Sequence, residues 1–553
     1  MRKTGFLWTM WFMTFAASGG AVAPEIGCKA SGKGGAVAAG GADAVAAGIA
    51  MLEKGGNAAD AAAATLLALS ITDYGYFAIG AEIPLIIYDA RTSEVKVLCG
   101  QGGAPLDPAA TEWYYKNGIP TKGIKAATVP GAISLCVTLL KLYGTMTFEQ
   151  AVAPALALLD SGKEDWHPRL AATFRRLIAA EKATPGTREA GLQAARDRFY
   201  KGDIADELAA WYAASGGFLR KADLAAHVTR VEDPVKVQYR GYTICKCGPW
   251  TQGPYLCQTL RLLEGFDLGG MGHASADYVH VVTEALKLGL ADRDEYYGDP
   301  LFVDVPLKAL LSDEYTRLRR PLIDMAAAST EIRPGDPVGM KAVKGPGTPR
   351  PAPGGTTTCV VADRWGNVVA ATPSGNPPYA ICTPLGIAHA TRLSSLNTTP
   401  GHPNRIQPGK RPRITLTPTL ILKDGRAVGA ISVAGGDLQD QTTLNCLLNY
   451  VEFAMKPADA VTAPRFSTDH HENSFNPSPD RAATRGTLAG LTVDETIPRT
   501  VQDDLTKRGH KIQTTGQPIA FPVMLVVEPD TGLIHAAGDP RANRHAAAID
   551  RVP

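Results

Sequence analysis

Hydrophobic spacing in the first hundred residues predicts a helical pair followed by two strands. Residues 34–69 are rich in alanine with helical period, and the glycine–asparagine break at 55–57 is typical of a helix stop followed by an N-cap. Residues 83–89 and 95–99 are largely apolar runs joined by a short turn, which predicts two strands. The glycines at 32–41 follow no predicted strand, so they do not indicate a nucleotide-binding loop.

Apolar residues at helical spacing dominate the middle of the chain. The predicted helices there cover 132–143, 147–161, 168–181, 204–214, 255–264 and 274–291. The C-terminal part predicts strands at 419–422, 428–433, 523–527 and 534–537, with a helix at 441–453. Strands on both sides of a helical middle predict an α/β layered fold, with a sheet layer to which both halves of the chain contribute. The sequence contains no internal repeat.

A segment rich in proline and glycine, residues 333–355, leads directly into a strand that opens with threonine. Residues 356–362 are β-branched or small at nearly every position, and they turn through 363–367 into a second run at 368–372. This pattern predicts a β-hairpin. A hydroxyl can attack the carbonyl before it only if the intervening backbone bends, and Gly355 permits such a bend.

Thr356 is the candidate nucleophile of this hairpin. If the chain breaks between Gly355 and Thr356, the freed α-amine, with a reference pKa of about 8, lies beside its own hydroxyl and can act as the base. Thr357 and Thr358 leave the first residue ambiguous from the local sequence. The alternative is an ordinary linker that leads into a threonine-rich strand.

The N-terminus has the order of a secretory signal peptide, which we expect over residues 1–23. Arg2 and Lys3 precede an apolar run at 6–17, and small residues follow it. The run is short for a permanent membrane span. Residues 18–20 offer a competing cleavage site, and a buried N-terminal helix is the alternative. A signal peptide implies a secreted or periplasmic protein that has no membrane attachment once the signal is removed.

Composition argues against several function classes. Across 553 residues, 56 Lys and Arg face 54 Asp and Glu, so no net field attracts nucleic acid or an acidic membrane. The nine cysteines are an odd number, which leaves at least one free thiol. Cys245 and Cys247 are separated by one residue, which is not zinc-ligand spacing and predicts two buried side chains on one face of a strand.

The sequence offers no clear motif for metal or cofactor chemistry. Residues 469–472, Asp-His-His-Glu, are capable of binding a metal, but adjacent histidines point apart on a strand or helix and no distant third ligand is evident. The chain has no Gly-x-Ser-x-Gly elbow, no phosphate loop and no His-Glu-x-x-His motif. We therefore expect no metal ion and no other cofactor, and a small-molecule substrate rather than a nucleic acid.

Short blocks with distinctive residues are spread along residues 34–548. In chain order they are LEKGGNAADA (52–61), VPG (129–131), ADR (291–293), YGDP (297–300), PGHPN (400–404), PGKRP (408–412), TPT (417–419), GG (435–436), APRF (463–466) and GDPR (538–541). Together and in this order they resemble the γ-glutamyltransferase family of N-terminal nucleophile hydrolases, of which the chain looks like a divergent member. The resemblance implies a four-layer αββα sandwich, built from two intertwined chains after self-cleavage.

The resemblance also implies roles for particular residues. Thr356 falls on the family's nucleophile, and Ser374 matches the hydroxyl that orients it. Gly435 and Gly436 match the turn whose backbone N–H groups stabilise the oxyanion, although a simple tight turn is the alternative. Asn376 matches an asparagine that lines the pocket.

Five positions depart from the family's clamp for the γ-glutamyl group. The family arginine that binds the α-carboxylate is replaced by Gln101, which cannot supply a charged bidentate fork. The family's paired acids become Ser394 and Ser395, and its two carboxylate-binding serines become Ile414 and Thr415. Each lost charged hydrogen bond costs about 1.5–3 kcal/mol. The natural acyl group is therefore expected to differ from a standard γ-glutamyl group.

New charges lie close to these positions. Arg392 is either an exposed, solvated arginine or a group that binds an anionic acyl moiety without an amine, such as a dicarboxylic or oxalyl group. Arg413 is a second new charge in the same region. Asp437 and Gln439 follow the two glycines and are candidates for substrate contact.

The sequence therefore predicts a self-processing amidohydrolase or acyltransferase that works through an acyl-threonine ester. Cleavage after Gly355 would give a large fragment, 24–355, and a small fragment, 356–553, that stay associated as a heterodimer. Whether heterodimers assemble further is left open. The alternatives are a true glutathione hydrolase or γ-glutamyl transpeptidase with a rebuilt clamp, and a processed but inactive relative retained for binding.

Overall fold

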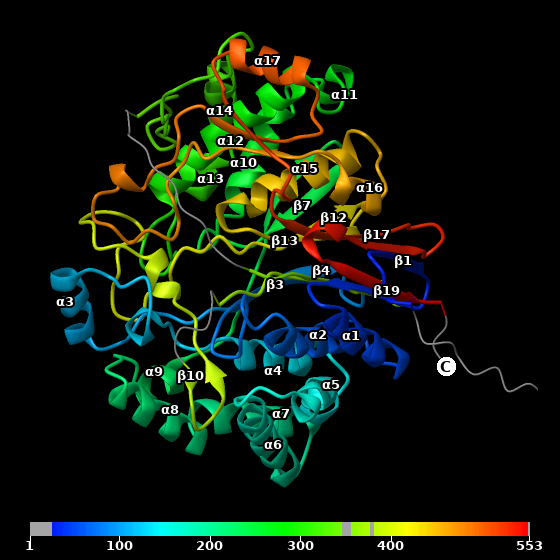
Figure 1. The fold of residues 1–553 in the computed structure, drawn as a ribbon, viewed down its shortest axis with the longest axis vertical. Helices are drawn as coiled ribbons and strands as arrows, with labels where there is room; N and C mark the ends of the chain where they lie inside the picture. Colours follow the sequence, from blue (N-terminus) through cyan, green and yellow to red (C-terminus); the bar gives the residue numbers. More distant parts are fainter. Residues whose placement is uncertain (1–24, 345–355, 376–380, 551–553) are drawn as a thin grey trace, which may run out of the picture.

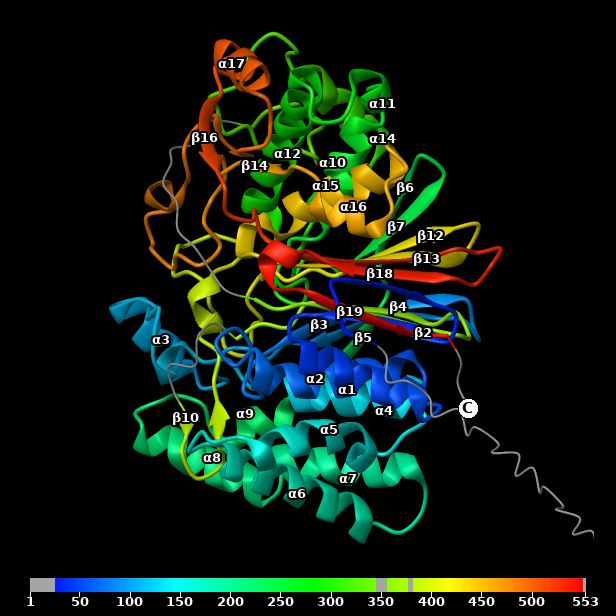
Figure 2. The same ribbon diagram turned by 45° about the vertical axis from the view of Figure 1, so that its right-hand side comes forward.

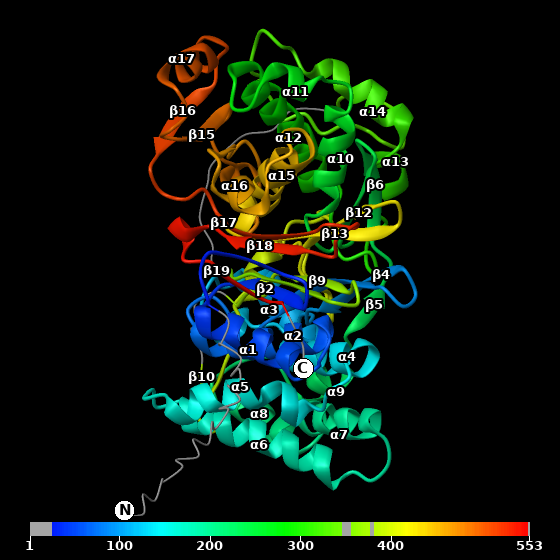
Figure 3. The same cartoon turned by 90° about the vertical axis from the view of Figure 1, so that its right-hand side faces the viewer.

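Two seven-stranded antiparallel sheets are stacked at the centre of the molecule, and helices cover the outer face of each sheet (Figure 1). The computed structural model describes residues 25–344, 356–375 and 381–550. The four layers are clearest in Figure 2, and Figure 3 shows one sheet lying over the other. This arrangement confirms the predicted αββα sandwich.

Each sheet contains strands from both sides of residue 355. The lower sheet has the order β19 (His545–Ile549), β2 (Gly35–Ala39), β8 (Cys359–Asp363), β9 (Val368–Ala371), β3 (Ile83–Asp89), β4 (Glu94–Gly100) and β5 (Arg230–Glu232). The upper sheet has the order β1 (Lys29–Gly32), β18 (Ile534–Gly538), β17 (Phe521–Val527), β13 (Arg426–Ala434), β12 (Thr419–Lys423), β7 (Tyr242–Lys246) and β6 (Val235–Tyr239). Both halves of the chain therefore contribute to two sheets, where the sequence predicted a shared sheet layer.

Helices form the two outer layers. Those on the side of the lower sheet are α1 (Ala42–Glu53), α2 (Ala58–Thr72), α4 (Ala132–Tyr143), α5 (Phe148–Ser161), α6 (His167–Ala183), α7 (Arg188–Tyr200), α8 (Asp203–Ala214) and α9 (Lys221–Ala226). Those on the side of the upper sheet are α10 (Pro254–Leu263), α11 (Leu268–Met271), α12 (Ala276–Tyr296), α13 (Leu307–Leu310), α14 (Asp313–Arg319), α15 (Gln439–Val451), α16 (Pro457–Thr462) and α17 (Arg499–Lys507).

Smaller elements complete the fold. Helix α3 (Pro108–Asn117) lies at one side of the molecule. The strands β10 (Ile381–Cys382) and β11 (Ile387–Ala388) form a short pair, and β14 (Phe466–Ser467), β15 (Gly490–Asp494) and β16 (Lys511–Thr515) form a three-stranded sheet near α17.

Three large hydrophobic clusters fill the spaces between the layers. One joins the lower helices to the lower sheet, one lies between the sheets, and one joins the upper sheet to its helices. In β8, Cys359 and Val361 belong to the first cluster, whereas Val360 and Ala362 belong to the second. This alternation is what a strand buried on both faces requires, and it fixes the direction of each side chain at the start of β8.

The alanine-rich stretch 34–69 is only partly helical. The predicted helix stop and N-cap are confirmed, because Asn57 caps α2 in a reciprocal pair with Asp60. However, residues 35–39 form strand β2, the second strand of the lower sheet, with β1 before it, so the helical prediction was wrong there and these glycines do follow a strand. Periodicity does not separate a short, fully buried alanine strand from a helix.

The cysteines are unpaired among the described residues, and two of them test a prediction from the sequence. All nine cysteines lie in the described part of the chain and none is paired there; Cys245 and Cys247 are buried in and just after β7, as predicted. Among the described residues, no helix is both long and apolar enough to span a bilayer. The predicted signal peptide (1–23), Gly355 and Asn376 lie outside the described residues.

Candidate active site

Three threonines lie just before β8, and their hydroxyls have different surroundings. The Thr357 hydroxyl donates to Asp73, which follows α2 on the side of the lower helices. The Thr358 hydroxyl is buried with no partner among the described residues. Of the three, only Thr356 contacts Ser374 and Gln439.

These two side chains meet at the Thr356 hydroxyl. Ser374, three residues after the end of β9, places its Oγ 3.4 Å from Thr356 Oγ. The Gln439 amide satisfies its surroundings when its nitrogen donates to the carbonyls of Val433 (3.1 Å) and Thr415 (3.0 Å), and its oxygen then accepts from Thr356 Oγ at 3.2 Å. The hydroxyl is buried, with Thr356 only 1% exposed. It is therefore held between the hairpin and the start of α15.

Arg392 reaches the nucleophile position through Ser374. Its Nη2 donates to Ser374 Oγ at 2.7 Å, and its Nε donates to Glu82 at 2.5 Å. Both charged residues are buried, so the prediction that Arg392 is an exposed, solvated arginine was wrong. Burial raises the pKa of Glu82, an effect that the Arg392 charge opposes. Arg392 Nη1 has no partner among the described residues.

The two glycines form a turn with left-handed backbone geometry after β13. Gly435 has φ +149° and Gly436 has φ +61°. A Cβ on Gly435 would lie 2.6 Å from the Cβ of Ala520, so the turn packs closely against the start of β17. The turn precedes α15 directly, and the Gln439 amide bridges the carbonyl of Val433 before it to the Thr356 hydroxyl. One side chain thus connects the turn to the candidate nucleophile.

Asp437 anchors this turn. It pairs with Arg293 of α12 at 2.6 Å, and it accepts hydrogen bonds from the backbone and hydroxyl of Ser474 at 3.0 and 2.5 Å. Burial acts to raise the pKa of Asp437, but Arg293 and its neighbours hold it well below its ordinary range. Arg413 donates to the same serine at 2.6 Å, and burial lowers the pKa of Arg413 to about 10. Asp437 is therefore an ionised group that positions the turn.

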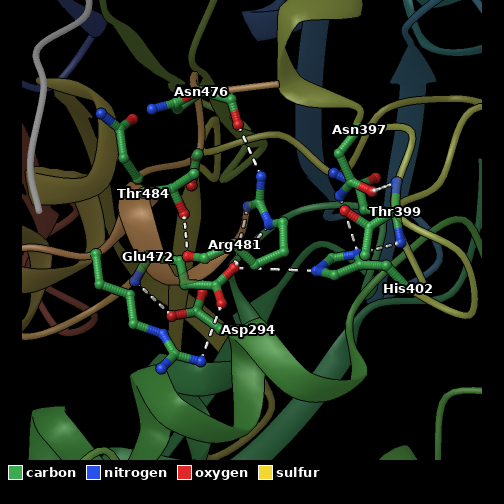
Figure 4. A network of polar contacts seen from close by, with 12 residues as sticks. Asp294, Asn397, Thr399, His402, Glu472, Asn476, Arg481 and Thr484 are labelled. Carbon is green, nitrogen blue, oxygen red and sulfur yellow. Dashed lines mark hydrogen bonds and ion pairs between the residues drawn. The ribbon is translucent and has the colours of Figure 1, made fainter. Parts of the chain in front are cut away.

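Glu472 is the centre of the polar network drawn in Figure 4. Its carboxylate pairs with Arg481 at 3.0 Å and with Arg485 at 3.4 Å, and it lies 3.9 Å from His402. Burial acts to raise the pKa of Glu472, but the nearby His402 and the charges of the arginines lower it to about 2. The backbone carbonyl of Glu472 accepts from Arg293 Nη2 at 2.9 Å. This network therefore supports the arginine that holds the glycine turn.

The other predicted clamp positions are buried, and their side chains bond elsewhere or have no described partner. Gln101 donates to the carbonyl of Pro412 at 2.9 Å, and Ser394 donates to the carbonyl of Thr391 at 2.8 Å. The hydroxyls of Ser395 and Thr415 are buried without partners among the described residues. The backbone carbonyl of Thr415, by contrast, connects to the candidate nucleophile Thr356 through Gln439.

Sequence reasoning missed two buried ion pairs beside the site. Glu82, just before β3, holds Arg392, and Lys246 of β7 holds Asp440 of α15 at 2.6 Å. Burial raises the pKa of Asp440 to about 6, although Lys246 opposes that effect. A charged residue inside an otherwise apolar run was the available signal, since such residues are almost never buried unless they are paired.

Two groups of residues have side chains capable of binding a metal. His470 bonds the carbonyl of Glu331 at 3.0 Å while His471 bonds that of Glu472 at 2.9 Å, so the adjacent histidines diverge. Elsewhere, ligand atoms of His280, Glu284 and His510 lie within 4.8 Å of one another.

The three residues of the second group already have hydrogen-bond or ion-pair partners. Glu284 pairs with Lys287, and with Arg333 at 3.1 Å, while His280 bonds both His510 and the carbonyl of Asp324 at 2.8 Å. A metal ion would have to displace these contacts.

The arrangement around Thr356 suits attack on a carbonyl by a hydroxyl. It combines one buried hydroxyl, two neighbouring hydrogen-bonding side chains, and a glycine turn of the kind that brings backbone N–H groups close to a reacting oxygen.

Comparison with known proteins identifies the family. Residues 44–188 and 165–549 match the family described as gamma-glutamyltranspeptidase. The chain is 28% identical over 540 residues to the glutathione hydrolase proenzyme of Bacillus subtilis (strain 168), covering 90% of this chain and 88% of that protein. It is also 28% identical over 532 residues to the acylase ACY 1 proenzyme of Pseudomonas sp. (strain SE83), covering 89% of each.

A solved structure supports the same conclusion. The cephalosporin acylase from Bacillus halodurans superposes with a TM-score of 0.80 at 25% identity, covering 98% of this chain and all of that one (100%). The shared fold confirms the predicted fold of the N-terminal nucleophile hydrolase type. The chain belongs to the gamma-glutamyltranspeptidase family and is an amidohydrolase of that family.

Proposed function

We propose that the chain cleaves itself between Gly355 and Thr356 and then hydrolyses amides through an ester on Thr356. The observation that carries the proposal is the set of contacts to Thr356 Oγ, which lies 3.4 Å from Ser374 Oγ and 3.2 Å from the Gln439 amide. The hydroxyl of Thr357 is committed to Asp73 instead. Relatives that are named proenzymes also favour a processed chain.

Self-processing is proposed to use the same hydroxyl. Thr356 Oγ attacks the carbonyl carbon of Gly355, the Gly355–Thr356 C–N bond breaks, and an ester replaces the amide. The hydroxyl proton goes to the nitrogen, which becomes the free α-amine of Thr356. Water then hydrolyses the ester, which releases the Gly355 carboxylate and restores the Thr356 hydroxyl. The large fragment 24–355 and small fragment 356–553 remain together as a heterodimer, because each sheet uses strands from both.

Turnover repeats the same chemistry on a substrate. The free amine of Thr356 accepts the proton of its own hydroxyl as the oxygen attacks the substrate amide. Backbone N–H groups of Gly435 and Gly436 stabilise the oxyanion, and each such donor is typically worth about 3–4 kcal/mol. The amine half leaves with a proton, and water or a second amine then removes the acyl group from Thr356.

The acyl group is proposed to differ from γ-glutamate. The positions of the family clamp carry Gln101, Ser394, Ser395 and Thr415, none of which is charged. Arg392 instead supplies a buried guanidinium beside Ser374, with Nη1 unpaired among the described residues. This group would suit an anionic acyl moiety that lacks an amine, such as a dicarboxylic or oxalyl group.

A true glutathione hydrolase is the second candidate, and the Bacillus subtilis relative favours it. Release of an aniline from γ-glutamyl, oxalyl and simple acyl anilides separates the two. We expect the highest kcat/KM for a substrate without the γ-glutamyl zwitterion. A preference of tenfold or more for the γ-glutamyl anilide would favour the second candidate.

Acylation itself is tested by quenching turnover in acid and measuring the mass of the small fragment. We expect the mass of one acyl group, localised to Thr356 by peptide mapping. Acylation at another residue, or none during measurable turnover, would contradict the mechanism. A secreted or periplasmic location also belongs to the proposal and rests on the N-terminal pattern at 1–23.

A further inference from the structure

A cavity of about 580 Å³ opens beside the glycine turn. Its described lining begins at the turn itself, with Gly435, Asp437 and Leu438. The segment after β14 contributes Asp469, His471, Asn473 and Phe475. Gly486 and two residues of the three-stranded sheet, Thr492 and Gln513, form another part of the lining. The start of β17 and the residues before it contribute Pro518, Ala520 and Phe521. The volume is in the range of sites that hold small molecules.

Two lining residues place the cavity next to the reaction site. Gly435 lines it while packing against Ala520, another lining residue. Phe475 lines it too, and its ring lies 5.4 Å from the guanidinium of Arg392, which donates to Ser374. A molecule in the cavity would therefore lie directly beside the turn that is proposed to stabilise the oxyanion.

The cavity is separate from the predicted acyl clamp. Gln101, Arg392, Ser394, Ser395 and Thr415 are all absent from its described lining. Since an amide has two halves and the acyl half is proposed to lie among those residues, the cavity is left for the amine half.

The charges of the cavity lining also favour the amine half of the substrate over the acyl half. The described lining contains no lysine or arginine, but it contains the carboxylates of Asp437 and Asp469. Asp437 is paired with Arg293, so Asp469 supplies the like charge that a carboxylate-bearing acyl group would meet there. The amine half takes up one proton and leaves as a neutral amine, so it would meet no such repulsion.

The shape of the lining indicates what the amine carries. Two aromatic rings, Phe475 and Phe521, and the aliphatic side chain of Leu438 provide large apolar surfaces on one cavity. Rings of this kind favour a flat or bulky apolar partner. His471 adds a polar group: its Nδ1 bonds the carbonyl of Glu472, and no described residue bonds its Nε2.

We propose that this cavity, the amine-side cavity, binds the amine half of the substrate and selects amines that carry an aromatic or bulky apolar group. The proposal rests on the proposed function, because it takes Thr356 as the reacting residue. It assigns specificity on the leaving-group side to residues that lie outside the acyl clamp.

The test compares two amides with the same acyl group, an anilide and a methylamide, in the mature enzyme. Phe521→Ala removes one aromatic wall, and we expect it to raise KM for the anilide about tenfold while KM for the methylamide changes less than twofold. Trp365→Ala, an aromatic truncation at the 48% exposed turn between β8 and β9, is the matched control and should change neither value. Equal effects of Phe521→Ala on both substrates would overturn the proposal.

Product inhibition distinguishes the two halves of the substrate. Aniline should compete with the anilide, and Phe521→Ala should weaken that competition about tenfold. If the variant weakens inhibition by the free acid instead, the cavity binds the acyl half and the proposal is wrong.

A small electrophilic acylating probe separates failure of this proposal from failure of the proposed function. Labelling of Thr356 in wild type and variant alike, without amine selectivity, would overturn the cavity assignment alone. Absence of labelling at Thr356 would overturn both.

Discussion

At the scale of single residues, the proposed site depends on which of three consecutive threonine hydroxyls lies beside Ser374 and Gln439. Thr357 is bonded to Asp73 and Thr358 is buried without a described partner, whereas Thr356 meets Ser374 and Gln439. The local sequence could not make this choice. The contacts across the layers favour Thr356 as the candidate.

Arg392 offers the sharpest test of these contacts. Arg392→Lys keeps the charge but loses the planar fork that joins Glu82 to Ser374. We expect kcat for acylation to fall about tenfold or more while the protein still folds. Measurement of single-turnover acylation, with urea unfolding in parallel, checks both parts.

Arg392→Ala, which removes the side chain beyond Cβ, should also lower the stability of the protein. Arg392→Ala leaves the buried carboxyl of Glu82 without its partner, and breaking a buried pair typically costs about 3–5 kcal/mol of stability. A lysine variant with full activity would show that the fork does not position Ser374. An alanine variant as stable as the wild type would show that the pair is not needed for folding.

Glu472 predicts a defined pH dependence of stability. The pKa of its carboxyl falls from an ordinary 4.5 to about 2 on folding. Folding thus favours the ionised form, so the stabilisation is complete above pH 4.5 and is lost as the pH falls towards 2. We expect Glu472→Gln to be about 3 kcal/mol less stable than wild type at pH 7, with the difference shrinking between about pH 5 and pH 2.

Urea unfolding at several pH values measures this difference. Glu112→Gln, at an exposed position of α3, is the matched control and should track the wild type throughout. A Glu472→Gln deficit that stays constant from neutral pH down to about pH 2 would contradict the role of ionisation.

At the scale of elements, the glycine turn between β13 and α15 carries the strictest geometric requirement. Gly435→Ala would force a residue with a Cβ to adopt φ +149° and to clash with Ala520. We expect acylation to slow about 100-fold, comparable to the loss of one oxyanion donor. Burst kinetics with an anilide measure this effect.

Gly425→Ala in the β12–β13 hairpin is the control for backbone strain alone. Gly425 also has positive φ, +76°, but a Cβ there meets nothing within 4 Å. Similar loss of acylation in both variants would show that strain, and not the oxyanion turn, explains the effect.

Much of the element order could be predicted, and the failures have physical causes. The hairpin at β8 and β9 and the long helix α12 follow from patterns that are strong over their whole length. Strand β2 was predicted as helix because alanine is a good helix former, and only its burial between β19 and β8 determines its state.

Some residues of the candidate site could be predicted from the sequence and others could not. Thr356, Ser374 and the two glycines were predicted because they lie in recognisable blocks. Ser374 lies 3.4 Å from Thr356, and Gln439 connects Thr356 to the strand before the glycine turn, while their catalytic roles stay predictions. Glu82 was missed because its partner, Arg392, is 310 residues away in sequence. A charge inside an apolar run indicates that Glu82 is buried and paired. The identity of its partner depends on the packing of both layers, and no local pattern shows which residue that is.

At the scale of the whole molecule, the two intertwined sheets would hold the fragments together after cleavage. A break at residue 355 would leave β2 paired with β8 and β7 paired with β12, so antiparallel pairing would still join the fragments in both sheets. We expect the two fragments to co-elute in size-exclusion chromatography and to unfold in one cooperative transition. Separation of folded fragments without denaturant would contradict this expectation.

The central claim is that Thr356 cuts the chain and becomes its new N-terminus. N-terminal sequencing of the small fragment from purified mature protein tests it most directly, alongside the Thr356→Ala variant. We expect a sequence that begins at Thr356 in the wild type and a single uncut chain in the variant. A fragment that begins at Thr357 or Thr358, or normal cleavage in Thr356→Ala, would contradict the claim.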